Sequence, residues 1–466
     1  MTTSEVQVIV IGAGLSGLRA AKELHDAGLS YVVIEAMERV GGKTLSMPTK
    51  DDGKARVDLG AAWINDTTQT EMHSMAEAFG LGLEEQRTKG ISVYQDSLGQ
   101  LSSGPYGMES DLTPDQAREM ENVMAKLMKF IEGCNPEDPR QGADAAKLDS
   151  MTVMELAEDV FGGSEVAHLF LATMTGSFFG ADPDAMSALQ LVDYIKNATG
   201  LTNILSETKD GTQYLHIKQG CQAFATNLAA QLNQGSIKLS SPAKLISQSD
   251  QGCVVETCDG TIYRGAKVIL SIPTPLYHSV TFQPDLPHAK AVLRESAKYG
   301  YYAKTVLVFP FPWWREIGLS GSLHSEEGPI RFARDTSAPE EGQYSITCFH
   351  VAGTGRAWSE LPADERQKTV LEHYRTLFSG AAKDVPEPIQ VLEKEWSKDP
   401  FALGVGTPVM MPGIMTGDAY RALRDPFGHI HFVGTETAIA WKGFMEGAVR
   451  AGSRGAREVI WAIKST

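Results

Sequence analysis

A strand, a glycine-rich turn, a helix and a second strand follow one another between Val6 and Glu35, and this unit constrains the fold more than any other stretch. Its glycines, Gly12, Gly14 and Gly17, have G-x-G-x-x-G spacing. The first permits a tight turn, the second lets a pyrophosphate approach the backbone, and the third lets the helix pack closely on the strand. The free N–H groups at the start of the helix attract the phosphates.

The second strand, residues 31–34, leads directly into Glu35. The Glu35 carboxylate is able to accept hydrogen bonds from both hydroxyls of an adenosine ribose. A glycine-rich turn alone is weak evidence, because many such turns bind no ligand. Here the strand, glycines, helix, second strand and acidic residue occur in the expected order within one βαβ unit, which predicts a dinucleotide-binding α/β fold.

Length, charge and cysteine content restrict the class of protein. The 466 residues are enough for about two or three domains. A formal net charge of -16 argues against nucleic acid and an anionic membrane surface as partners. No stretch has the roughly 18 uninterrupted apolar residues of a membrane span, and the N-terminus does not resemble a signal peptide. Five cysteines without a C-x-x-C pair are typical of a reduced protein, so we expect a soluble, cytoplasmic one.

Two later segments favour FAD over NAD as the dinucleotide. Residues 39–43 place a glycine doublet between two cations, where it offers a second approach to the diphosphate. Residues 57–64 form a strand followed by small residues, which leave room for a flat ring. A flavoprotein fed by bound NADPH usually needs a second G-x-G-x-x-G, which this chain lacks. We therefore expect the electrons to come from the substrate and to pass to O2 or another diffusing acceptor.

Two insertions interrupt the dinucleotide-binding part. Residues 83–217 are mostly helical, with capping-box patterns that begin at Thr113 and Thr152. Apolar side chains at positions 120, 124, 127 and 131 indicate a buried helix face rather than a ligand site. Strands return at 238–257, and residues 297–396 add a strand at 301–309 and a helix near 364–378. We expect the helical insertion to cover a substrate.

The sequence resembles the flavin-dependent amine oxidases, which include monoamine oxidase and polyamine oxidase, over residues 6 to about 460. The most specific matches are the opening glycines with Glu35, the segments 39–42, 303–309, 434–438 and 441–447, and Trp396. The resemblance implies an α/β fold with a Rossmann-like FAD-binding domain built from residues 1–83, 218–293 and 398–466. An α+β substrate-binding domain would then comprise residues 84–217 and 294–397.

The resemblance also implies which residues bind FAD. The ADP half would be held by Gly12, Ala13, Gly14, Ser16, Gly17, Glu35 and Ala36, with Ala243 on the adenine side. The diphosphate would lie along Arg39, Gly41, Gly42 and Lys43. The ring and ribityl chain would contact Gly60, Ala61, Ala62, Trp63, Trp396, Gly434, Thr435, Glu436, Phe444 and Met445. The last helix would direct its N-terminus at the N1/C2=O side of the flavin, where its dipole favours negative charge.

Three residues of the implied active site have other interpretations. Lys304 matches a lysine that reaches flavin N5 through a water, whereas an isolated lysine on a strand more often points outward. Trp396 matches a tryptophan beside the isoalloxazine, and the alternative is core packing. Gln213 would lie on the wall of the substrate cavity.

The sequence departs from the family pattern at four positions. Val405 stands where monoamine oxidases carry the cysteine that bonds to FAD, so we expect non-covalent FAD. Gly406 removes one wall of the usual aromatic cage unless an aromatic from the helical insertion refills it, and Phe444 replaces tyrosine as the other wall. Lys43 replaces the commoner arginine and offers a point charge instead of a bidentate fork.

The sequence therefore predicts an FAD-dependent amine oxidase. We expect it to convert a primary amine to an imine, which hydrolyses to an aldehyde or ketone and ammonia, while O2 becomes H2O2. The alternatives are a polyamine oxidase, an L-amino-acid oxidase, a flavin amine dehydrogenase and, least favoured, a non-catalytic flavin-binding protein. No metal is expected, because the H-x-H pair His429 and His431 lacks a third ligand. The chain is a candidate for homodimer formation.

Overall fold

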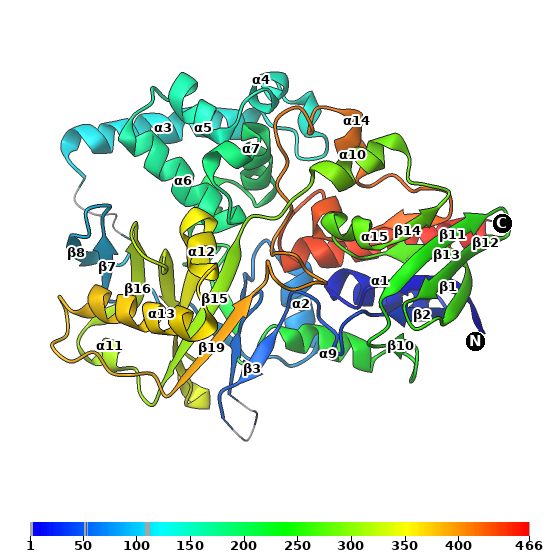
Figure 1. The fold of residues 1–466 in the computed structure, drawn as a ribbon, viewed down its shortest axis with the longest axis horizontal. Coiled ribbons are helices and arrows are strands. Elements are labelled where there is room, and N and C mark those ends of the chain that lie inside the picture. The colour runs from blue at the N-terminus through cyan, green and yellow to red at the C-terminus, as the bar shows by residue number, and fades with distance from the viewer. Residues whose placement is uncertain (1–2, 51–52, 54, 108–111, 466) are drawn as a thin grey trace.

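The computed structural model describes residues 3–50, 53, 55–107 and 112–465. An eight-stranded sheet, at the end of the molecule that holds both termini in Figure 1, has the order β10-β2-β1-β13-β12-β11-β14, with β20 beside β13. Its strands are β1 (Thr3–Ile11), β2 (Tyr31–Ile34), β10 (Ile237–Lys238), β11 (Ala243–Ser249), β12 (Gly252–Thr257), β13 (Ile262–Leu270), β14 (Thr281–Gln283) and β20 (Ile430–Phe432). The pairs that β1 forms with β2 and β13 are parallel.

Strand β1 is apolar along its whole inner length because both of its faces are buried. Val8 and Val10 pack against helices α1 (Leu15–Asp26), α9 (Gln222–Ala230) and α15 (Met445–Lys464). Ile9 and Ile11 face a second cluster formed largely by the other strands of the sheet. The predicted strand–helix–strand unit is confirmed, with the second strand at residues 31–34 as expected.

A seven-stranded sheet forms the other end of the molecule, in the order β19-β15-β18-β17-β16-β7-β8. Its strands are β7 (Ile91–Gln95), β8 (Leu101–Pro105), β15 (Tyr302–Phe309), β16 (Leu319–Ser325), β17 (Phe332–Asp335), β18 (Tyr344–Val351) and β19 (Gln390–Glu395). Helices α11 (Trp313–Glu316), α12 (Ala352–Ser359) and α13 (Ala363–Phe378) accompany this sheet and bury Trp313, Trp314 and Trp358 in its core.

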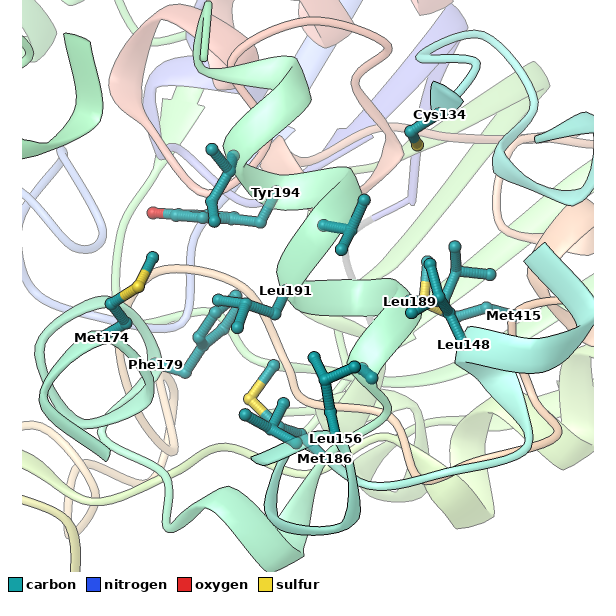
Figure 2. Close-up of a cluster of buried hydrophobic side chains, with 14 of the residues drawn as sticks. Cys134, Leu148, Leu156, Met174, Phe179, Met186, Leu189, Leu191, Tyr194 and Met415 are labelled. Atoms are coloured by element: carbon teal, nitrogen blue, oxygen red, sulfur yellow. The ribbon is translucent and has the colours of Figure 1, made fainter. Parts of the chain in front are cut away.

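A helical layer lies above this second sheet in Figure 1. It contains α3 (Pro114–Gly133), α4 (Ala145–Asp149), α5 (Val153–Glu155), α6 (Glu165–Phe179), α7 (Ala188–Asn197) and α8 (Leu201–Leu205). Both predicted capping boxes are present, since Thr113 accepts from the Gln116 N–H and Thr152 from the Glu155 N–H. The predicted apolar stripe on α3 is core: Leu127 is fully buried in the cluster whose centre Figure 2 shows.

Short elements connect these layers. They are α2 (Thr70–Ala78), α10 (His288–Ser296), α14 (Asp418–Ala422), the pair β3 (Ser46–Pro48) and β4 (Arg56–Asp58), and the small sheet of β5 (Trp63–Ile64), β9 (Leu215–Ile217) and β6 (Leu83–Glu85). The predicted two-part α/β architecture is thus confirmed. Strand β9 pairs with β5 and β6 although it precedes the predicted boundary at 218, and the boundaries themselves stay predictions.

All five cysteines are free thiols. Within the described ranges, no helix combines the length and the apolar character required to cross a membrane.

Candidate functional site

One cavity of about 620 Å3 collects residues from almost the whole length of the chain. Every residue predicted to bind cofactor or substrate lines this cavity, apart from Ala13, Gly17 and Arg39. The carboxyl ends of β1 and β2 open into it, which is where open α/β sheets bind ligands. Val405, the position without a cysteine, also lies on its wall.

The three exceptions contact protein rather than the cavity. The Ala13 N–H donates to Glu35 Oε2 at 2.5 Å. A Cβ at Gly17 would lie 2.0 Å from the Gly12 carbonyl oxygen, so helix α1 packs on the turn as closely as predicted. The Arg39 guanidinium donates to the carbonyl oxygens of Gly42 at 2.7 Å and Thr44 at 3.0 Å, and so supports the second glycine turn from behind.

Glu35 is held in place at the end of β2. Its Oε1 accepts from the Met37 N–H at 2.8 Å, and its Oε2 accepts from Ala13. Burial raises the pKa of this carboxyl, although the two backbone donors oppose the shift. The carboxylate is therefore anchored on one side by the backbone while it lines the cavity on the other.

The glycine turn has the free space and the unsatisfied donors that a diphosphate needs. A Cβ built on Gly14 would meet no atom within 4 Å, and no side chain caps the N-terminus of α1. The Ser16 hydroxyl is buried on the cavity wall without a hydrogen-bond partner in the described structure. Since buried polar groups are nearly always paired, these observations fit a bound phosphate at this helix N-terminus.

Lys43 brings a positive charge to the same wall. Its Nζ donates to the Tyr299 hydroxyl at 2.5 Å. Lys43 keeps some surface open to the cavity but lies deep in the protein, and this burial lowers its pKa to about 7 against the attraction of Glu436 and Asp399. Glu436 Oε1 in turn accepts from the Thr274 N–H at 3.0 Å.

Lys304 points inward from β15 and is 5% exposed, so the alternative of an outward lysine is wrong. Its Nζ donates to the Gly60 carbonyl oxygen at 2.5 Å and lies 3.4 Å from that of Asp58. Burial lowers the pKa of Lys304 to about 8, although Asp58 opposes the shift. Trp396, after β19, donates from Nε1 to the Leu59 carbonyl oxygen at 2.7 Å, so both side chains hold the segment that contains residues 58–60.

Aromatic side chains line the cavity beside Phe444, the N-cap of α15. The Tyr194 ring from α7 stacks on Phe444 with 5.5 Å between centroids and 23° between planes. Phe178 from α6 lies 5.7 Å from Tyr194. A Cβ at Gly406 would meet only the Phe178 carbonyl oxygen, at 3.6 Å. The helical insertion thus contributes the aromatic surface on this side of the cavity.

Sequence reasoning missed Tyr194, Phe178, Tyr302 and Phe349. Tyr302 had a usable signal, because strand alternation places it on the same face as Lys304. Phe349 had none, since it becomes the neighbour of Lys304 only through the antiparallel register of β15 and β18. The Lys304 ammonium lies 5.0 Å from the centre of the Phe349 ring.

Few charged groups reach the cavity. Among the described residues that line it, Glu35 and Glu436 are the only acids, and Lys43 and Lys304 the only bases. Both acids accept hydrogen bonds from backbone N–H groups. Elsewhere, His431 pairs with Glu458 at 2.9 Å, and the described part of the chain holds no group of three or more His, Cys, Asp or Glu suited to a metal ion.

A parallel sheet with a glycine turn, a helix N-terminus and a buried lysine on one cavity define a dinucleotide-binding oxidoreductase. The family model for flavin-containing amine oxidoreductases matches residues 15–460, and the chain belongs to this family. Membership implies a flavin cofactor, and the residues of the cavity fit one.

Relatives cover nearly the full chain. Amine oxidase (flavin-containing) B of Sus scrofa is 31% identical over 470 residues, which cover 99% of this chain and 87% of that protein. A putrescine oxidase structure with bound putrescine has a TM-score of 0.90 at 26% identity and covers 98% of this chain and 100% of its own. Cyclohexylamine oxidase from Brevibacterium oxydans has a TM-score of 0.89 at 27% identity, with 98% and 99% covered.

Proposed function

We propose that this protein is an FAD-dependent oxidase of primary monoamines. Overall, R–CH–NH2 loses two electrons and two protons to give the imine, which water converts to a carbonyl compound and ammonia, and O2 gains both to give H2O2. The family, the cavity and its aromatic lining support this proposal. O2 as the acceptor follows from the absence of a second G-x-G-x-x-G in the sequence.

Residues of both ends of the cavity would bind FAD. Gly14, Ser16 and Glu35 would hold the ADP half, and Lys43 would neutralise diphosphate charge. The start of α15 would place its positive dipole end beside the ring. When bound, the flavin supplies the two-electron acceptor that the chain itself lacks. We propose non-covalent attachment, because Val405 provides no thiol.

The chain's own residues would position the amine and exclude water. The rings of Tyr194, Phe444 and Phe349 provide apolar walls on which a hydrocarbon group can pack. Such walls favour the neutral amine, because an ammonium without a counter-charge is costly to bury. Lys304, anchored on the Gly60 carbonyl oxygen, would hold a proton-donating group at the centre of the site.

The distribution of charge carries the choice of a monoamine. A polyamine oxidase requires acidic groups for the distal ammonium, and an L-amino-acid oxidase requires a cation for the carboxylate. The described cavity has no arginine, and its two acids are bonded to backbone N–H groups in the part that fits the cofactor. Neither alternative is supported by this lining.

An amine panel tests the proposal. The purified protein is supplied with benzylamine, cyclohexylamine, putrescine and an L-amino acid, and H2O2 and ammonia are measured. We expect equal yields of both products from the two monoamines and little from the others. Flavin should appear in the supernatant after acid precipitation. No H2O2 with any amine would refute the oxidase, and yellow flavin in the pellet would refute non-covalent binding.

The sequence-based expectations of a cytoplasmic location and of a homodimer belong to this proposal, and gel filtration with light scattering tests the latter.

A further inference from the structure

A buried charged cluster lies directly behind the aromatic wall. The Lys442 ammonium donates to Asp193 Oδ2 at 2.5 Å and to the Tyr420 hydroxyl at 2.5 Å. The Tyr420 hydroxyl donates to the same Asp193 oxygen at 3.2 Å. The Lys442 and Asp193 side chains are 6% and 1% exposed. The three residues come from α7, α14 and the loop before α15, so the cluster joins the helical insertion to the cofactor-side loop.

The pair is charged and largely satisfied. Burial opposes the ammonium, but Asp193 and Tyr420 hold the pKa of Lys442 above its ordinary value. The Asn197 amide donates to Asp193 Oδ1 at 2.8 Å. A buried pair of this kind contributes little net stability compared with apolar side chains of equal volume, so stability alone does not explain it.

Each charged residue is next to a residue of the cavity wall. Asp193 precedes Tyr194, and Lys442 precedes Gly443 and Phe444. Gly443 has φ +87°, and a Cβ there would lie 2.8 Å from the Tyr194 ring, so the loop rests directly on that ring. In Figure 2 the Tyr194 ring extends from α7 on the side of Met174 and Phe179, away from Leu189 and Met415.

Packing does not fill the space behind this wall. A void of about 10 Å3 is bordered by Asp193, Tyr194, Thr407 and Lys442 among others. Thr435 Oγ1 accepts from the Gly443 N–H and donates to the Phe444 carbonyl oxygen, each at 2.8 Å, and so fixes the loop on its other side. The ion pair supplies the opposing restraint.

We propose that Lys442 and Asp193 are positioning residues, whose ion pair sets the placement of the stacked Tyr194 and Phe444 rings and thereby the shape selectivity of the cavity. The inference rests on the proposed function only in taking the ligand to be an amine. Without the pair, Tyr194 and Phe444 gain freedom to shift into the void, and the wall discriminates less between flat aromatic and slim aliphatic side groups.

The test uses the holoprotein of a neutral double variant, Asp193→Asn with Lys442→Met. Lys442→Met alone would leave a buried carboxylate unpaired and is expected to fold poorly, whereas the double change removes both charges. The matched control is Lys22→Met with Asp26→Asn, which removes a surface pair on α1 with N···O 2.6 Å. Three quantities are measured: the melting temperature, the ratio of kcat/KM for benzylamine over n-butylamine, and the Kd of benzyl alcohol from the flavin absorbance spectrum.

We expect the ratio to fall and the Kd for benzyl alcohol to rise, each by about tenfold, in the cluster variant and not in the control. Values within about threefold of the wild type for both would overturn the proposal, whatever the melting temperature, and leave a purely structural pair. The alcohol carries no amine to oxidise. If the wild type proves inactive on amines, the proposed function fails while the binding comparison still decides the role of the pair.

Discussion

At the scale of single residues, the surroundings of Lys304 set its charge. The side chain is buried against the rings of Trp63 and Phe349, and its anchors are carbonyl oxygens rather than a carboxylate contact. Its pKa of about 8 lies close to physiological pH, instead of the ordinary 10.5. A lysine in this state is able to hold or release a proton during catalysis.

Replacing Lys304 with methionine should leave FAD bound but slow one half-reaction by about ten- to a thousandfold, the scale of a lost positioned proton donor or charge. Stopped-flow absorbance identifies which of flavin reduction and reoxidation is slowed. In the wild type that rate should decline as pH rises through about 8, because the ammonium is lost there, and the variant should lack this inflection. Wild-type rates in both half-reactions would remove Lys304 from the active site.

Gly406 tests the shape of the cavity. Gly406→Tyr should restore an aromatic wall and lower kcat/KM for a branched amine more than for benzylamine, by roughly ten- to two-hundredfold in the ratio. Because Gly406 has φ +67°, any side chain there is strained, so Gly406→Ala is the control that carries the strain without the ring. If both variants keep the wild-type ratio, position 406 does not line the substrate path.

At the scale of elements, the first βαβ unit uses two of its glycines for different purposes. Gly17 is required by the fold itself, since a Cβ there would lie 2.0 Å from the Gly12 carbonyl oxygen. Gly14 faces open space in the protein. Only a ligand above the turn would give Gly14 a reason to lack a side chain.

This difference predicts opposite results from two alanine variants. Gly17→Ala should lower the melting temperature of the apoprotein, because helix α1 must move away from β1. Gly14→Ala should leave the apoprotein melting temperature within a few degrees of the wild type while it weakens FAD binding by about tenfold or more. Calorimetry of the apoprotein and fluorescence titration with FAD measure the two effects. Unchanged FAD affinity in Gly14→Ala would place the diphosphate elsewhere.

At the scale of the whole molecule, buried histidines couple stability to pH. Burial lowers the pKa values of His216, His324, His350 and His373 from 6.5 to about 4. Between pH 6.5 and 4 the unfolded chain therefore binds protons that the folded chain does not, and the free energy of unfolding falls as pH falls. Asp58, whose pKa is raised to about 6 by burial, acts in the opposite direction, but it is one group against four.

His350 provides the clearest measurement, because it is fully buried, with its nitrogens on the Pro329 carbonyl oxygen and the Thr305 hydroxyl. His350→Gln should reduce the slope of unfolding free energy between pH 6.5 and 4 by about 1.4 kcal/mol per pH unit. Urea unfolding of the apoprotein at several pH values gives the slope. His278→Gln, at a surface side chain that is 52% exposed, is the control. Equal slopes in the wild type and His350→Gln would contradict the burial argument.

Local chemistry made the first 35 residues and the cofactor wall readable from the sequence. Strand β2 follows from its apolar run, the helix caps at Thr113 and Thr152 from side chains three residues apart, and the glycine turn from its spacing. These features depend on residues close together in the chain, where propensity and hydrogen bonding act directly. The resemblance then extended the site to Lys304 and Phe444.

Only the tertiary structure decided how the substrate side of the cavity is built. The Tyr194–Phe444 stack joins residues 250 positions apart, and the Lys442–Asp193 pair joins residues 249 positions apart. Phe349 reaches Lys304 through strand register, and Arg39 turns to the backbone because its loop folds around it. Such contacts depend on how whole layers pack against one another, and the pattern of neighbouring residues in the chain carries no record of that packing.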